Sequence, residues 1–226
     1  MRLVLLVSPL FPHLCGAFAP QATPQEKLER ARMVNFDYVA NMPNFVADET
    51  AKRYTSDFGS QKWRHSDTID TEIAFTGERV VRRRLRRNGK PWNRPFTDLP
   101  GFKWYGGFGT EIKPIFDPQC PTTVEYEGAT ELDGTHVLDY RFSSPADGCF
   151  AAFLARNVEY NPARNGHVFV DEVAGNAIRV EEDAFGFPVG FGLTERREQV
   201  SWAYVKIGDE WRIRSLKLTR LRVDIA

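Results

Sequence analysis

The chain has 226 residues, 42% of them hydrophobic, which is enough for one sizeable core and argues against two full domains. Its 30 basic residues are balanced by 30 acidic ones, and this zero net charge argues against a dedicated nucleic-acid-binding protein. Only four histidines are present, so a histidine-rich metal site is not expected. The composition is that of a folded globular chain without long disorder.

The first nineteen residues have the features of a signal peptide. Met1 and Arg2 give a positive start, a short apolar stretch follows, and Ala17–Phe18–Ala19 has the small-x-small pattern of a signal-peptidase site. The stretch is far shorter than the ~20 apolar residues that span a bilayer, and no later segment approaches that length. Pro20 hinders a cut after Ala19, and a cut after Ala17 avoids it. We therefore expect a periplasmic or secreted protein without a transmembrane segment; the alternative is a slightly apolar cytosolic N-terminus.

Export determines how the three cysteines are interpreted. Cys15 would leave with the signal peptide, so the mature chain keeps Cys120 and Cys149. Two cysteines in an oxidising compartment most simply form one disulfide, worth roughly 3–4 kcal/mol in the chain-entropy model. The alternative is a zinc site made by both cysteines with His136 and His167, but no C-x-x-C or H-x-x-x-H spacing favours it. We expect no metal.

One helix is expected near the N-terminus. Thr23–Pro24–Gln25–Glu26 provides a Thr cap, a proline at the first helical position and a glutamate at the third. Apolar residues at roughly helical spacing form one stripe: Leu28, Ala31, Val34, Tyr38 and Met42. Pro43 ends the helix.

From Asn44 onward, short alternating runs separated by turn residues predict antiparallel strands. Asn88–Gly89 and Asp133–Gly134 are hairpin signals. The candidate strands are residues 69–75, 80–87, 124–127, 136–142, 150–159, 167–171, 178–182, 200–207 and 213–223. The predicted fold is mainly β (α+β): one domain over residues 20–226, in which the helix packs on a strongly curved antiparallel sheet of about nine to ten strands.

Two aromatic loops interrupt this meander. Residues 91–121 contain six prolines and a dense aromatic group that includes Trp104, Tyr105 and Phe108, with a short helix expected between 108 and 116; the second loop contains Phe187 and Phe191. Loops are usually polar, so apolar loops require something to cover. Either both loops cap the core, or these five aromatic residues line an apolar ligand-binding cavity.

No residues indicate catalysis. The sequence has no G-x-S-x-G, H-E-x-x-H or P-loop motif. Glu181 and Asp183 would share one strand face, which is more typical of a solvated surface than of an acid/base pair. His136 and His167 each follow a hairpin turn and are interpreted as surface or satisfied histidines. We expect a protein that is not an enzyme and has no cofactor.

The run Arg82–Arg87 holds five arginines and Leu85. Strand alternation places Arg82, Arg84 and Arg86 on one face, with Arg83, Leu85 and Arg87 on the other. Cross-strand partners are available in Asp67, Asp70 and Glu72, so the run is interpreted as a salt-bridged solvent face. The functional alternative is contact with phosphorylated lipid headgroups.

Several segments resemble a family of uncharacterised exported proteins of soil bacteria. They are Tyr38–Phe45, Glu49–Thr50, Arg53–Tyr54, Trp63, Asp67–Ile69, Arg87–Pro91 and Val205–Gly208. The helix and curved sheet are in turn similar to the outer-membrane lipoprotein-sorting carriers, in which a half-barrel sheet shelters acyl chains. Gly166–Asp171 and Ala177–Glu181 are similar to paired strands of these carriers. The resemblance provides no catalytic residues.

The chain departs from that family at Glu210–Arg214, so the last fifteen or so residues are interpreted as a truncated or altered tail that leaves a basic sheet edge. The resemblance implies non-enzymatic binding or carriage of an apolar ligand, a lipid or a lipoprotein acyl chain, in the cell envelope. A second hypothesis is an envelope scaffold that docks a protein partner through the free sheet edge.

Overall fold

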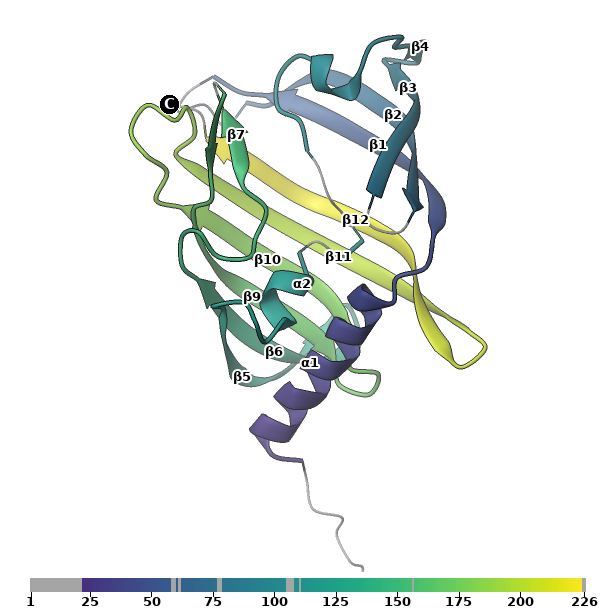
Figure 1. The fold of residues 1–226 in the computed structure, drawn as a ribbon, viewed down its shortest axis with the longest axis vertical. Coiled ribbons are helices and arrows are strands. Elements are labelled where there is room, and N and C mark those ends of the chain that lie inside the picture. The colour runs from purple at the N-terminus through teal and green to yellow at the C-terminus, as the bar shows by residue number, and fades with distance from the viewer. Residues whose placement is uncertain are drawn as a thin grey trace, which may run out of the picture.

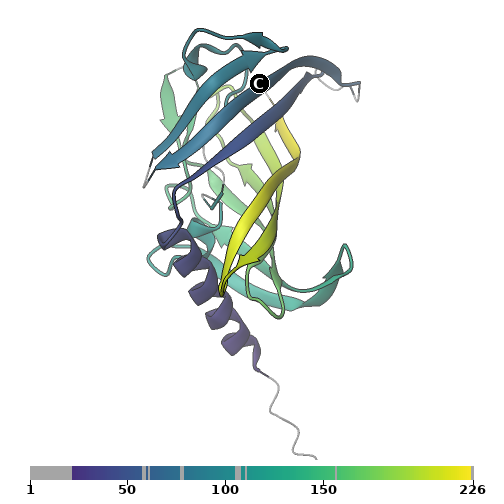
Figure 2. The same ribbon diagram turned by 90° about the vertical axis from the view of Figure 1, so that its right-hand side faces the viewer.

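The computed structural model describes residues 22–224, apart from 58, 59, 61, 77, 78, 105–107, 110 and 156. The expected signal peptide, Cys15 and Tyr105 lie outside these residues. The described chain is mainly β: one long helix packs on antiparallel sheets (Figure 1). The helix lies across one end of the largest sheet, and a smaller sheet occupies the other end of the molecule, as Figure 2 also shows.

The smaller sheet, sheet A, has the strand order β1-β2-β3-β4. Its strands are β1 (Phe45–Thr55), β2 (Arg64–Thr76), β3 (Arg79–Arg87) and β4 (Lys90–Pro91). A short 3₁₀ turn, η1 (Phe96–Asp98), and a four-residue helix, α2 (Lys113–Phe116), follow in the proline-rich segment. The short helix expected between residues 108 and 116 is therefore confirmed over its last turn.

The larger sheet, sheet B, has the order β12-β11-β10-β9-β6-β5. Its strands are β5 (Thr123–Leu132), β6 (Thr135–Ser144), β9 (Ala163–Asp171), β10 (Ala177–Phe185), β11 (Glu195–Ile207) and β12 (Glu210–Asp224). The segment interpreted as an altered tail thus forms an antiparallel strand paired along β11. In the described residues the two sheets do not close on each other, so the expected half-barrel remains a prediction.

The N-terminal helix α1 (Pro24–Ala40) begins as predicted. Thr23 accepts a hydrogen bond from the Glu26 amide, and the Glu26 carboxylate accepts one from the Thr23 amide, which completes a capping box. Backbone and side-chain hydrogen bonds from Thr23 lower the pKa of Glu26. Leu28 and Ala31 are buried on the stripe that faces the sheet.

A buried asparagine fixes α1 to sheet B. Asn35 occupies the same helical stripe and is 1% exposed. Its Nδ2 donates to the Gly175 carbonyl at 2.9 Å, and its Oδ1 accepts from the Ala177 amide at 2.8 Å. The helix comes so close to this β9–β10 turn that a Cβ on Gly175 would lie 3.2 Å from Val34. Gly175 also has a φ of +83°, so the turn requires glycine for both reasons.

The core lies between sheet B and these helices. Tyr140, Phe142, Val168 and Val180 form its sheet side, and Leu28, Ala31, Ile115 and Phe116 are among the residues from the helical segments that pack against it. The Cys120–Cys149 disulfide is present, with a Cα–Cα distance of 5.6 Å, so the predicted pairing is confirmed. It links the segment after α2 to the loop after β6. Because both thiols are in this bond, the zinc alternative is excluded.

One strand prediction was wrong. Residues 150–159 form two short strands, β7 (Phe153–Ala155) and β8 (Val158–Tyr160), which pair as a separate hairpin. Phe150 lies before this hairpin and is buried against Phe142, with the two rings stacked 6.0 Å apart. Strands β1 and β4 match no candidate range, and together with this division they bring the described chain to twelve strands rather than nine or ten.

The predicted alternation of the arginine run was also wrong. The β2–β3 register shifts between Asp70 and Glu72, and Arg84 has a φ of +51°, which is the geometry of a β-bulge. Arg82 and Arg87 consequently turn inward, while Arg84 and Arg86 are exposed. The expected partners are confirmed for Arg87 with Asp67 and for Arg84 with Glu72. The face is not simply solvated, because Asp67 is fully buried.

We predict that Asn35→Leu lowers the free energy of unfolding by roughly 2–4 kcal/mol, because a buried amide and a buried carbonyl lose their partners. Urea denaturation measures the change. Asn41→Ala is the matched control, since the Asn41 side chain makes one exposed hydrogen bond, to the Asp37 carbonyl at the end of the same helix. Equal losses of unfolding free energy in the two variants would contradict the role of Asn35 in fixing α1 to sheet B, which we call the Asn35 clamp.

Candidate functional site

The aromatic residues predicted to bind ligand fall into two separate clusters. Trp104 and Phe108 pack against sheet A, whereas Phe187 and Phe191 contact the β7–β8 hairpin. Tyr105 lies outside the described residues. Among the described residues, the four rings thus belong to two groups of contacts, and a shared cavity remains a prediction.

The sheet A cluster has a polar component. Trp104 donates its indole N–H to Glu49 at 2.8 Å, and its ring lies 5.3 Å from that of Phe96. The Arg82 guanidinium stacks 4.5 Å from the Phe96 ring centre and pairs with the same Glu49 carboxylate. Phe108 contacts Phe45 at 4.5 Å. These contacts hold Trp104 and Phe96 over the strands of sheet A, and the Arg82 Nη2 is buried without a hydrogen-bond partner among the described residues.

The second cluster combines the buried ring of Phe191 and three partly buried rings with exposed apolar side chains. Phe187 contacts Phe153, Tyr160 and Phe191 at centroid distances of 5.3, 6.1 and 5.6 Å. The Tyr160 hydroxyl donates to the Gly186 carbonyl and so fixes the loop to the hairpin. Four large apolar side chains on the hairpin and the adjoining end of β10 and its loop are exposed to solvent: Leu154, Val158, Phe185 and Val189.

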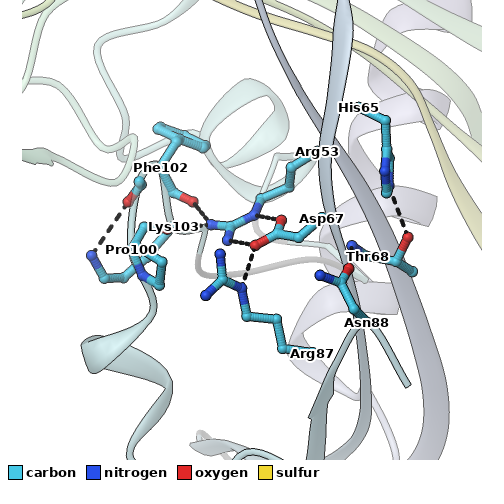
Figure 3. A network of polar contacts seen from close by, with 10 residues as sticks. Arg53, His65, Asp67, Thr68, Arg87, Asn88, Pro100, Phe102 and Lys103 are labelled. Carbon is cyan, nitrogen blue, oxygen red and sulfur yellow. Dashed lines mark hydrogen bonds and ion pairs between the residues drawn. The ribbon is translucent and has the colours of Figure 1, made fainter. Parts of the chain in front are cut away.

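A buried carboxylate connects the three long strands of sheet A (Figure 3). Asp67 of β2 receives two hydrogen bonds from Arg53 of β1, at 2.7 and 2.6 Å, and one from Arg87 of β3 at 2.7 Å. Arg53 also donates to the carbonyls of Pro100 and Phe102, which fixes the aromatic loop over the sheet. These hydrogen bonds, that from Arg53 first, hold the pKa of Asp67 below its usual value.

Sheet B contains the same arrangement. Glu182 of β10 is 4% exposed and accepts from Arg164 of β9 at 2.7 Å and from Arg196 of β11 at 2.9 Å. Both guanidinium groups lie within 5.4 Å of the Phe153 ring centre, beneath the second aromatic cluster. Burial lowers the pKa of Arg196. Glu182 lies between Glu181 and Asp183, the pair expected on a solvated face, and unlike them it is buried.

A cavity of about 320 Å³ opens at the opposite end of β10, beside the turn that binds α1. Its wall includes Leu132, Ile178, Arg179, Trp202 and Tyr204. Tyr204 donates its hydroxyl to the Ala177 carbonyl at 2.7 Å, and burial raises its pKa strongly. A second hollow of about 220 Å³ is lined by polar residues of β9, β10 and β11, among them His167, Glu181 and Asp183.

Within the described residues, no three side chains of His, Cys, Asp or Glu are grouped so that they could hold a metal ion. His167 pairs with Asp139 at 2.8 Å on sheet B, which fits the expected satisfied histidine. Glu181 and Asp183 line the polar hollow, and Asp183 has Arg197 3.7 Å away. A burial-raised pKa of about 12 keeps Tyr140 protonated in the core.

Comparison with known proteins identifies no relative: no family model matches the sequence, and no curated protein or solved structure gives a significant match. Across the described residues, no helix combines the length and the apolar character needed to cross a membrane. The site must therefore be interpreted from its own geometry.

Three features of the site were missed in the sequence. Asn35 had a signal, since it shares the helical stripe of Leu28 and Ala31. The Glu182 site had none, because its carboxylate is completed by arginines from two other strands, whereas for Asp67 the pairing with the arginine run was predicted and only Arg53 and the burial were not. The Arg179 cavity depends on an irregular strand register between Ala177 and Arg179, which no residue pattern marks.

We predict that Asp67→Asn lowers the free energy of unfolding by about 3–5 kcal/mol at neutral pH, because two partly buried arginines lose their counter-ion. A lowered folded-state pKa gives stability that is complete above the ordinary aspartate pKa, 3.8, and is lost as pH falls through the lowered value. The difference between wild type and variant should therefore shrink below about pH 4.

Urea denaturation at several pH values measures this difference. Asp70→Asn on the same strand is the control, because Asp70 accepts an exposed hydrogen bond from Thr50 and should cost less than about 0.5 kcal/mol. A difference for Asp67→Asn that stays constant down to pH 2 would refute the ion-pair role.

Proposed function

We propose that the protein is a non-enzymatic binding protein for an apolar ligand, an acyl chain of a lipid or lipoprotein, in the cell envelope. The observation that carries this proposal is the set of exposed apolar side chains on the β7–β8 hairpin, the end of β10 and the 186–191 loop, three segments joined by the ring contacts of Phe187 and the hydrogen bond from Tyr160 to Gly186. Exposed apolar side chains grouped on a rigid base are typical of interaction sites rather than of ordinary protein surface.

The base of this surface is preorganised. The rings of Phe153, Tyr160, Phe187 and Phe191 contact one another, and Phe153 in turn lies on the guanidinium groups bound to Glu182. A ligand therefore meets side chains that are already ordered, and little conformational entropy is lost on binding. Burial at about 25 cal/mol per Å² of apolar surface supplies affinity without chemistry.

Export is part of the proposal. The N-terminal residues have the pattern of a signal peptide, and the Cys120–Cys149 disulfide is the kind of bond that persists in oxidising compartments. We also propose that the sheet forms a half-barrel that shelters an acyl chain, as in the lipoprotein-sorting carriers. We assign the ligand contact to Phe187 and Phe191, with Trp104 and Phe108 covering sheet A.

A scaffold function is the second candidate. Strand β12 is the terminal strand of sheet B in the described chain, and it runs from Glu210 to Asp224 along β11. An extended segment of an envelope protein could add to this edge by backbone hydrogen bonding. Such docking would not involve the 186–191 loop. A substitution in that loop, Val189→Ser, should therefore weaken binding only if the protein binds an acyl chain there.

We predict that Val189→Ser weakens binding of a pyrene-labelled phosphatidylcholine roughly tenfold, because a fully exposed valine that the acyl chain would cover is lost. The fluorescence titration uses the full chain, secreted to a periplasm and purified without detergent. Val173→Ser is the control: Val173 is 80% exposed in the turn at the other end of β10.

Native mass spectrometry of the same preparation should show extra mass of a lipid's size that organic extraction removes. If the purified chain carries no lipid and the labelled phospholipid does not bind, acyl-chain binding is refuted and the edge-docking candidate is favoured. Equal weakening by both valine substitutions would contradict the assignment of the surface.

A further inference from the structure

The cavity beside α1 has a different chemistry from the apolar surface and lies at the other end of β10. Most of its wall is apolar, and Leu132, Ile178 and Trp202 contribute to it. Its volume of about 320 Å³ lies at the lower end of the range for small-molecule sites. One long cationic side chain, Arg179, also lines it.

A strand irregularity produces this combination. The β9–β10 register shifts between Ala177 and Arg179, so Ile178 and Arg179, which a regular strand would direct to opposite faces, both line the cavity. In β11 the consecutive residues Ser201 and Trp202 likewise both contribute to the wall, next to a second register shift at Ala203. Because of the two register shifts, Arg179 and Trp202 line the same cavity.

Arg179 is largely buried but weakly held. Its side chain is 17% exposed, and its ion pair with Asp133, at 2.8 Å, is made with a carboxylate that is 83% exposed at the tip of a hairpin. Exposed ion pairs of this kind contribute only about 0–1 kcal/mol. Its other polar contacts with described residues are a 3.3 Å hydrogen bond to Ser201 and a 3.9 Å approach to Glu181.

The other carboxylate in the wall is already engaged. Asp171 accepts hydrogen bonds from the amides of Val173 and Ala174, and so caps the turn that receives α1. The Tyr204 hydroxyl is similarly committed to Ala177. The indole N–H of Trp202 is buried and has no hydrogen-bond partner in the described part of the chain. Arg179 is thus the cationic group of the wall, beside the hydroxyl groups of Thr135 and Ser201 and the side-chain amide of Asn176.

We infer that this cavity binds a small organic carboxylate with an apolar body. The carboxylate takes the place of Asp133 on the Arg179 guanidinium, and the apolar body is buried against Ile178, Leu132 and Trp202. Guanidinium and carboxylate match in geometry and charge, so exchange of a rim aspartate for a ligand carboxylate retains the ion pair and adds apolar burial. The inference is independent of the proposed acyl-chain surface.

The test is a calorimetric titration of the full chain with octanoate, octanol and octylamine, which measures the affinity for each. Octanoate should bind most tightly, and Arg179→Met should weaken it roughly tenfold or more while leaving octanol almost unchanged. Arg141→Met is the matched control, because Arg141 is an ion-paired arginine of sheet B that does not line the cavity. Circular dichroism and a thermal melt establish that the variants fold.

A second variant acts in the opposite direction and does not depend on a buried residue. Asp133→Asn removes the competing carboxylate from an exposed turn position that asparagine tolerates, and should tighten octanoate binding several-fold. Failure of octanoate to bind, tighter binding of octylamine, or octanoate affinity unchanged in both the Arg179 and Asp133 variants would overturn the inference. Loss of phospholipid binding in Val189→Ser with octanoate binding intact would separate the two sites.

Discussion

A carboxylate bridged by two arginines is the constraint on which both sheets depend. In sheet A the bridge runs from Arg53 through Asp67 to Arg87, and in sheet B from Arg164 through Glu182 to Arg196. Each carboxylate lies on the middle one of three adjacent strands. A one-residue slip of either outer strand would direct its arginine to the other face and leave a buried charge uncompensated. The two bridges therefore specify strand register, whatever their net contribution to stability.

The two bridges and the Asn35 clamp contact the aromatic loop and the two proposed binding regions. The sheet A bridge reaches the aromatic loop through Arg53, and the sheet B bridge supports the Phe153 ring beneath the apolar surface. At the other end of β10, the Asn35 clamp fixes the turn beside the Arg179 cavity. Strand β10 thus connects two proposed binding regions, one apolar and one amphipathic, through a backbone held in place from both sides.

Features that depend only on residues close together in the chain were predicted correctly from the sequence. The capping box of Thr23 and Glu26, the turns at Asn88–Gly89 and Asp133–Gly134, and most strands of sheet B depend on neighbouring residues and were predicted. The disulfide followed because only Cys120 and Cys149 remain after the expected cleavage. The alternation of the arginine run failed because the bulge at Arg84 changes which residues face inward, and a bulge leaves no mark in a run of like residues.

The site was less predictable for the same physical reason. Five aromatic residues were grouped by their composition, but loops have no periodicity that assigns them to a sheet, and the structure divides the four that it describes between two clusters. The buried bridges join residues 14–20 positions apart, and their arginines look identical in sequence to exposed ones. Only the register of three strands distinguishes Arg87 from Arg86.

Amide hydrogen exchange of Glu182→Gln, read by mass spectrometry of peptic peptides, tests the role of the bridges most directly. Glu181→Gln, at the neighbouring half-exposed position, is the control. If the bridge specifies register, exchange should accelerate together in β9, β10 and β11, by roughly a hundredfold for a loss of about 3 kcal/mol, while β1–β3 keep their protection. Unchanged protection in β9–β11, or an equal loss throughout both sheets, would contradict that role.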